Sequence, residues 1–210
     1  MDFSARIKPL LTKVYSPEQV ETLIPQLQNL LQPYLQQVSR EDWRKWSHDN
    51  VLLITYGDSL IADDGRSPLA VLADFLETQL KDSITGVHIL PFFPYTSDDG
   101  FAIKDYTAVS PELGDWPDIK RISQSFNLMV DLVINHISGE HPWIKQFQAG
   151  EKPGCDYLIE AEPYDEKLSE VVRPRSSPLL TQLETVDGPK HVWSTFSSDQ
   201  TCLGPSTVSN

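Results

Sequence analysis

The chain has 210 residues, of which 40% are hydrophobic and 22% are charged, and its formal net charge is -13 at pH 7. This is an ordinary globular composition, in a chain long enough for one domain with its own core. The acidic balance argues against a nucleic acid or an anionic membrane as partner, because both are bound through cationic surfaces.

Apolar runs and cysteines bear on where the protein is located. The longest apolar runs, such as VLLITY from Val51, are far shorter than the roughly 20 residues of a membrane span. The first residues, MDFSARIKPLLTKVYS, lack the apolar core of a signal peptide. Cys155 and Cys202 are the two cysteines of the chain, without the spacing of a metal site. We therefore expect a cytoplasmic protein with reduced thiols.

Residues 1–49 are expected to form a helical extension. Ser16-Pro17-Glu18-Gln19 has the pattern of a capping box with proline at the first helical position. Apolar residues follow at helical spacing as far as Val38. Pro25 and Pro33 predict kinks that divide this stretch into two or three short helices.

Residues 50–136 alternate between strand and helix patterns. Three apolar runs predict strands: NVLLITY, GVHILPFF and LMVDLVIN. Between them, Ser67-Pro68 and Asp115-Trp116-Pro117 predict helix starts. Strands that are apolar on both faces and alternate with amphipathic helices indicate a parallel sheet. The connection from Pro91 to Asp115 is long, and α/β proteins place their sites in loops at one end of such a sheet.

The remaining residues have a different character. Residues 137–190 contain many Pro, Glu and Asp residues and predict an irregular inserted subdomain, with one short helix at Pro142–Ala149. Residues 191–210 begin with the strand-like run HVWSTF and end without a recognisable element.

The sequence YTSDDGF, which ends at Phe101, has two interpretations. Asp98 and Asp99 before Gly100 fit a simple turn. Alternatively, a carboxylate holds sugar hydroxyls while the Phe101 ring covers an apolar face of the sugar. Local sequence alone leaves both interpretations open.

The run DLVINH brings three polar groups to the end of the third predicted strand. Strand alternation would place Asp131 and Asn135 on one face and His136 on the other. A buried carboxylate without a partner is costly, so Asp131 is expected either to pair or to act in a site. A satisfied core aspartate with an Asn-His cap explains the pattern equally well.

The run VVRPRSSP carries two arginines around a proline. Arg173 and Arg175 fit a phosphate or carboxylate site, because guanidinium groups bind such anions in a fork. Exposed arginines that pair with the acidic run EAEPYDE are the alternative. Neither a phosphate-binding glycine loop nor a His-Glu-x-x-His metal pattern is found, and we expect no metal and no cofactor.

Taken together, the motifs resemble the α-amylase superfamily, glycoside hydrolase family 13, and more closely its sucrose phosphorylase branch. The resemblance spans about residues 50 to 200 and is carried by LLITYGDSL, GVHILPFFPYTSDDGF, DYTAVSPELGDWPDI, MVDLVINHIS, RPRSSPLLTQLET and HVWSTFSSDQ. The helical start and SDDGF are more similar to branch members that phosphorolyse glucosylglycerate, glucosylglycerol or sucrose 6-phosphate. The sequence does not specify which acceptor is used: fructose, fructose 6-phosphate, glycerate and glycerol all stay open.

The resemblance implies an α/β fold of the (β/α)8 TIM-barrel type, truncated after about three βα units, with its site on the C-terminal face. In that site Asp98 would hold hydroxyls of the glucosyl unit, Phe101 would be its platform, and His136 would bind its 6-hydroxyl. These roles are implied by position in the matching motifs.

Four further residues receive roles from the same resemblance. Asp131 would orient an arginine from the next strand, and Asn135 would fix the loop end without binding calcium. Arg173 or Arg175 would receive inorganic phosphate.

The family mechanism is retaining phosphorolysis of an α-glucoside to glucose 1-phosphate, through a glucosyl-enzyme. The Arg-x-Asp nucleophile motif that the family carries at the end of strand four, and the acid/base glutamate after strand five, are not found in this sequence. We therefore expect a sugar-binding part of such an enzyme that is inactive alone and carries an open sheet edge. A hydrolase or transglucosidase of the same superfamily and a non-catalytic remnant or binding module are the alternatives.

Overall fold

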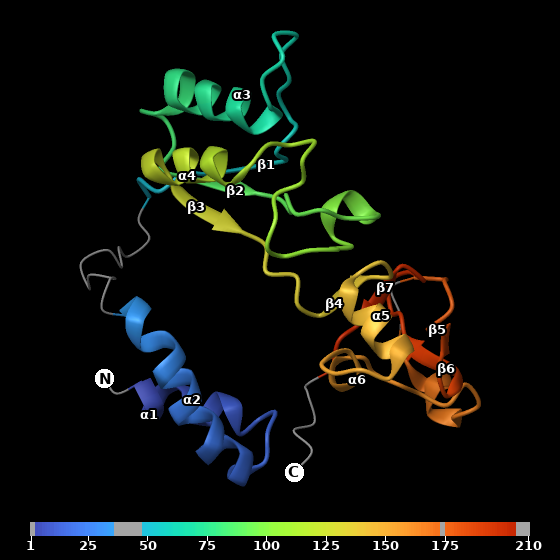
Figure 1. Ribbon diagram of the computed structural model, residues 1–210. Coiled ribbons are helices and arrows are strands. Elements are labelled where there is room, and N and C mark those ends of the chain that lie inside the picture. The colour runs from blue at the N-terminus through green and yellow to red at the C-terminus, as the bar shows by residue number, and fades with distance from the viewer. Residues whose placement is uncertain (1–2, 36–47, 173–174, 205–210) are drawn as a thin grey trace. The chain divides into compact units, whose positions relative to one another are not determined.

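The computed structural model describes residues 3–35, 48–172 and 175–204. The chain divides into two compact units, Met1–Ser47 and His48–Asn210 (Figure 1). Each unit is described by itself. None of the helices in the described ranges is long and apolar enough to cross a membrane.

The first unit is a pair of helices, α1 at Phe3–Leu11 and α2 at Pro17–Leu35. The backbone N–H of Gln19 donates to Ser16 Oγ at 3.3 Å, and the N–H of Ser16 donates to Gln19 Oε1 at 3.0 Å. These reciprocal bonds are the capping box that the sequence predicts.

The predicted division of α2 at its prolines is wrong. The helix continues through both Pro25 and Pro33, and both prolines are exposed. A proline on the solvent side leaves the freed carbonyl open to water, so the helix can bend gently without ending.

The second unit contains the predicted parallel sheet. Its strands are β1 at Leu52–Thr55, β2 at Gly86–Ile89 and β3 at Asn127–Val130, paired in parallel in the order β1-β2-β3.

The third strand is shorter than predicted, because Val130 is paired with the last residue of β2, Ile89. Pro91 follows β2 and has no N–H to continue the ladder. The predicted strand therefore breaks after Val130, and its last residue, Asn135, is followed by a separate strand, β4, at His136–Ser138.

Two helices cover one side of this sheet (Figure 1). Helix α3, at Pro68–Phe75, is capped by Ser67 and continues into a π-helical turn at Leu76–Leu80. Helix α4, at Trp116–Ser125, begins with a capping box between Asp115 and Asp118. Both starts confirm the sequence prediction, because capping is written in neighbouring residues.

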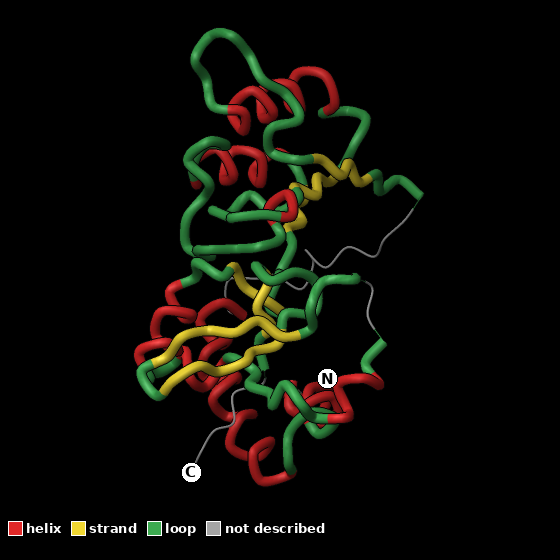
Figure 2. The backbone as a smooth tube through the Cα atoms, turned by 90° about the vertical axis from the view of Figure 1, so that its right-hand side faces the viewer, coloured by secondary structure: helices red, strands yellow, loops and turns green. Residues whose placement is uncertain are grey.

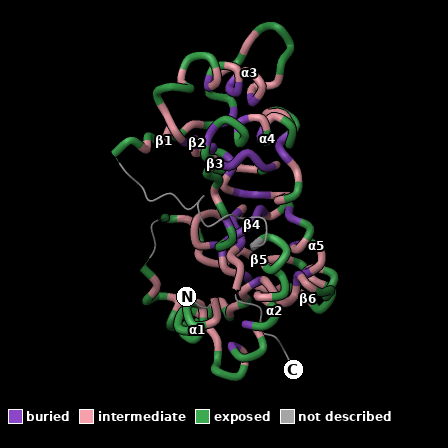
Figure 3. Tube along the Cα trace, turned by 90° about the vertical axis from the view of Figure 1, so that its left-hand side faces the viewer, coloured by how far each residue is buried: buried purple, intermediate pink, exposed green. Residues whose placement is uncertain are grey.

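Side chains between the sheet and these helices form the main core, and buried residues are purple in Figure 3. Leu53, Val87 and Leu128 share one register position across the sheet and belong to this cluster. Helix α3 supplies Leu69, Leu72 and Ala73 to this core, and the π-helical turn supplies Leu76.

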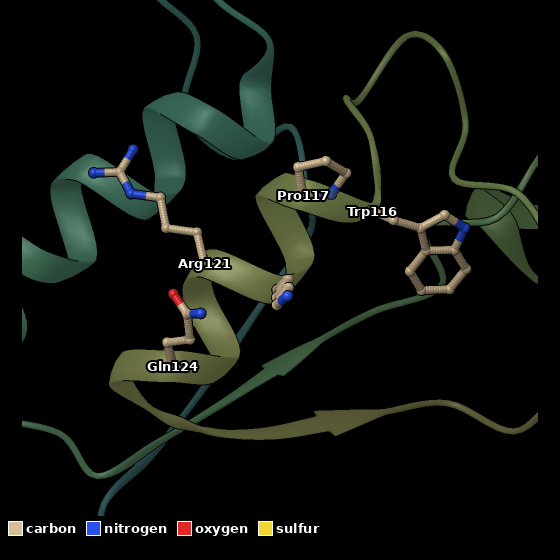
Figure 4. Close-up of a pocket in the computed structure, with 5 residues that line it drawn as sticks. Trp116, Pro117, Arg121 and Gln124 are labelled. Carbon is tan, nitrogen blue, oxygen red and sulfur yellow. The ribbon is translucent and has the colours of Figure 1, made fainter.

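The two helices are also joined by charge. Arg121 reaches from α4 toward α3 (Figure 4), and its Nη2 lies 2.5 Å from Asp74 Oδ1 and 2.7 Å from Glu77 Oε2. These groups are partly exposed, so solvent weakens the pairing and packing remains the larger contribution.

The opposite face of the sheet is much less covered. Ile54 and Met129 lie beside His88 in the register, and they are 59% and 40% exposed. In a (β/α)8 barrel this face points to the interior, where side chains of other strands fill the space.

After β3 the chain forms a small second layer of structure. Strand β4 pairs antiparallel with β7 at Gln200–Cys202, and β5 at Leu180–Thr185 forms a hairpin with β6 at Gly188–Trp193 (Figure 2). Helix α5, at Pro142–Ala149, confirms the predicted helix.

Short elements complete this region: α6 at Gly154–Tyr157 and a 3-10 turn at Glu166–Glu170. Another 3-10 turn, Asp98–Gly100, lies in the loop after β2. The sequence pattern missed β5 and β7, because each gains its order from a partner strand. The boundary expected at residue 190 falls inside the β5–β6 hairpin.

Two isoleucines on neighbouring strands test which face of the sheet is covered. Ile89 is fully buried and Ile54 is 59% exposed. We expect Ile89→Ala to lower the free energy of unfolding by about 2–5 kcal/mol, because it leaves a cavity, and Ile54→Ala by less than about 1 kcal/mol. Urea unfolding of both variants measures the difference. Equal losses would mean that the Ile54 face is covered in solution.

Candidate functional site

The candidate site begins in the loop after β2. Asp98 and Asp99 have positive φ angles of 59° and 49°, and Gly100 follows with φ of 98°. A Cβ atom on Gly100 would lie 2.6 Å from the Pro91 carbonyl oxygen, so only glycine fits there. The loop is thus fixed in a left-handed turn that presents an exposed Asp98.

A buried glutamine connects Asp98 to the predicted histidine. Gln200 Nε2 donates to Asp98 Oδ2 at 2.9 Å and lies 3.2 Å from His136 Nε2. His136 Nε2 also lies 3.0 Å from the carbonyl oxygen of Phe101. The structure therefore brings Asp98, Phe101 and His136 together, and sequence reasoning missed Gln200.

His136 is 5% exposed, and its ring lies 5.1 Å from that of Phe196. Burial lowers the pKa of His136 below its ordinary 6.5, although the Phe101 carbonyl and the Asp98 charge raise it. The imidazole is therefore neutral at pH 7, with one donor and one acceptor nitrogen.

The second ring nitrogen of His136 has a different environment from the first. Its Nδ1 is buried and has no hydrogen-bond partner within the described ranges. If Nε2 carries the proton and donates to Phe101, Nδ1 is an acceptor. Such a buried acceptor is stabilised by a water or by a ligand hydroxyl.

Phe101 and Asp99 have different surroundings. The Phe101 ring is half-buried and packs against the main core. Asp99 lines a separate pocket with Tyr56 and Tyr95 at the carboxyl ends of β1 and β2.

Asp131 pairs with a histidine of β2. Its Oδ2 lies 2.8 Å from Nε2 of His88, and the two side chains are 26% and 15% exposed. Asp131 follows β3 on the same face as His88 of β2. The signal for His88 was present as the one polar residue in GVHILPFF.

Asn135 and Arg175 lie outside the cluster around Asp98. Asn135 is exposed, and its carbonyl oxygen accepts from the N–H of Leu203 at 2.9 Å. Arg175 is exposed, and within the described ranges no hydrogen bond joins it to Asp98 or His136. Arg173 lies outside the described residues.

A second carboxylate supports the loop. Asp199 Oδ2 accepts from Thr96 Oγ1 at 2.5 Å and from Ser97 Oγ at 2.6 Å. Asp199 and Gln200 belong to the run FSSDQ, which carried part of the family resemblance without a role for either residue. That resemblance was the available signal for both.

The chain is similar to known proteins over most of its length. The family model of the α-amylase catalytic domain matches residues 78–180. The chain is 43% identical over 204 residues to glucosylglycerate phosphorylase of Spirochaeta thermophila, covering 94% of this chain and 34% of that protein. It is 49% identical over 158 residues to glucosylglycerate phosphorylase of Allomeiothermus silvanus, covering 75% of this chain and 28% of that protein.

A solved structure is also similar. The crystal structure of sucrose 6F-phosphate phosphorylase from Thermoanaerobacter thermosaccharolyticum matches with a TM-score of 0.67 at 31% identity, covering 76% of this chain and 34% of that chain. The chain thus spans about a third of the length of these relatives.

Parallel βα units with polar residues beyond the strand ends define the class as a (β/α)8 barrel-type protein, which confirms the predicted fold class. No closed barrel is formed by the residues that the structure describes. The chain belongs to the α-amylase superfamily, glycoside hydrolase family 13, and within it to the sucrose phosphorylase branch.

Acidification is expected to destabilise the fold. Burial lowers the pKa of His136 and of His141 below 6.5, so the unfolded chain binds these protons more readily. The stability that comes from keeping both histidines neutral is fully present above pH 6.5. It is lost as the pH falls from there toward their lower pKa values in the folded chain. Asp105, whose pKa is lowered from 3.8, titrates below this window.

The measurement is the urea midpoint at about pH 7.5 and pH 5.5, in the native sequence and in His136→Gln. The variant keeps a polar side chain that does not titrate, and its pH dependence should be flatter. A native midpoint that stays constant or rises on acidification would contradict the expectation.

Proposed function

We propose that this chain supplies the glucosyl-binding side of a retaining glucoside phosphorylase. Such an enzyme transfers a glucosyl unit from an α-glucoside to inorganic phosphate and yields glucose 1-phosphate. The observation that carries the proposal is the cluster of Asp98, Gln200 and His136, in which Gln200 donates to Asp98 and lies beside His136, in a chain of this branch. A carboxylate and a neutral imidazole together offer the acceptors that sugar hydroxyls need.

Each residue of the cluster has a role in this proposal. The Asp98 carboxylate accepts glucosyl hydroxyls through charge-assisted bonds, which are stronger than neutral ones. His136 accepts one hydroxyl at Nδ1, the buried nitrogen that has no hydrogen-bond partner within the described ranges. Phe101 limits the site beside the sugar ring, and Asp131 with His88 supports the adjoining barrel face.

We further assign glucosylglycerate as the donor substrate. The support is that two relatives at 43% and 49% identity are named glucosylglycerate phosphorylases. Arg173 and Arg175 are the proposed phosphate ligands, because a guanidinium fork matches a phosphate better than an ammonium does. Asn135 holds the start of β4 through its carbonyl.

The proposed chemistry is divided between this chain and residues outside its sequence. Retaining transfer needs a nucleophilic carboxylate and an acid/base group roughly 5–5.5 Å apart. Residues 131–210, which follow β3, contain no Arg-x-Asp motif of the kind that carries the family nucleophile.

Asparagine substitutions test the sugar-binding cluster. We expect Asp98→Asn to weaken binding of glucosylglycerate roughly 10- to 100-fold, because a charged acceptor is lost. Asp99→Asn is the matched control: the neighbouring residue has the same left-handed backbone, which asparagine tolerates, and we expect a change below about twofold. Calorimetric titration measures both. Equal affinities in all three proteins would refute the role of Asp98.

Incubation with glucosylglycerate and phosphate tests turnover by the 210-residue chain. We expect no glucose 1-phosphate, since the nucleophile motif is missing. Release of glucose 1-phosphate would overturn the division of roles but would support the phosphorylase class. Release of glucose without phosphate dependence would instead identify a hydrolase of the same superfamily.

A further inference from the structure

Asp199 ties three segments of the chain together. Its Oδ2 accepts from Thr96 Oγ1 and Ser97 Oγ, and its Oδ1 accepts from the N–H of Gly139 at 3.3 Å. The same N–H lies 3.0 Å from the main-chain oxygen of Asp199. One carboxylate therefore joins the loop after β2, the turn after β4 and the residue before β7.

The hydroxyls that Asp199 holds lead directly into the left-handed turn. Asp98 follows Ser97 and has φ of 59°, and Asp99 has φ of 49°. Non-glycine residues in this conformation persist only where surrounding contacts fix them. Thr96 is fixed further, because its Oγ1 lies 2.7 Å from Ser138 Oγ of β4.

Asp199 and Gln200 act on successive parts of the same loop. Asp199 holds Thr96 and Ser97, while Gln200 donates to the Asp98 carboxylate at 2.9 Å. Main-chain hydrogen bonds to Ala102 also hold Thr96 and Ser97, so loss of the Asp199 contacts loosens these two residues without releasing them. A contact outside the sugar-binding cluster thus sets the geometry inside it.

We propose that Asp199 is a positioning residue of the glucosyl site, which fixes the Thr96–Ser97 stem so that Asp98 meets Gln200 and His136. This inference rests on the proposed function, in which Asp98 binds the glucosyl unit. Asp199 itself does not touch the sugar; it acts through Ser97 and the backbone that follows.

Asp105 provides a matched control, and it lies in the loop after β2 that also contains Thr96, Ser97 and Asp98. Its Oδ1 accepts from the N–H of Thr107 at 2.7 Å and from Thr107 Oγ1 at 2.6 Å. The chemistry is that of Asp199, a carboxylate with a threonine hydroxyl and a backbone N–H. The difference is that Asp105 binds a residue only two positions away and does not reach Asp98 or His136.

The experiment compares Asp199→Asn with Asp105→Asn in the full chain. Calorimetric titration with glucosylglycerate, thermal unfolding, and amide hydrogen exchange of residues 97–100 are measured for each. We expect Asp199→Asn to weaken binding roughly tenfold and to speed exchange of these amides, while Asp105→Asn changes binding less than about twofold. If the two variants unfold at similar temperatures, the weaker binding of Asp199→Asn is due to lost positioning and not to a general loss of stability.

A second pair of variants addresses the coupling itself. Ser97→Ala removes one hydroxyl that Asp199 holds and should weaken binding by itself. In the Asp199→Asn background the same change should have no further effect, since the two residues act through one contact. Additive losses would overturn the proposal, as would equal binding by Asp199→Asn and Asp105→Asn.

Failure of the proposed function gives a different result. If the native chain binds no glucosylglycerate, the sugar role of Asp98 fails. The positioning role of Asp199 is then judged by hydrogen exchange alone. Faster exchange of residues 97–100 in Asp199→Asn than in Asp105→Asn would then support the positioning role of Asp199. Equal exchange in the two variants would refute it.

Discussion

The pairing of β4 with β7 is the interaction on which the candidate site depends. Ser138 is opposite Gln200 and His136 is opposite Cys202 in this short antiparallel ladder. The ladder carries Gln200 to within 3.2 Å of His136, a residue 64 positions earlier in the sequence. Without it, Asp98 would lose its hydrogen-bond partner, and the polar groups after β2 and β3 would have no common centre.

Local patterns predicted those parts of the fold that are determined by neighbouring residues. The starts of α2 and α4 were predicted because a capping box lies within four residues. The end of β3 was not, because Val130 stops pairing where its partner Ile89 stops. Apolar alternation cannot report where a neighbouring strand ends.

The residues of the candidate site fall into the same two groups: those that local motifs predict and those that only long-range contacts reveal. Asp98, Phe101 and His136 were predicted from motifs, and the structure brings them together. Gln200 and Asp199 were missed, since their contacts span 102 positions or more to Asp98 and Ser97. His88 was missed because only the register of two strands shows that it faces Asp131. Long-range pairing, rather than residue type, supplied this information.

The distance along the chain between Asp98 and Gln200 has a consequence for folding. Contacts between distant residues require closure of a long loop, and such contacts form late and slowly. The parallel sheet and its two helices use shorter separations and can form before residue 200 has left the ribosome. The order of synthesis therefore places formation of the cluster of Asp98, Gln200 and His136 after that of the parallel sheet.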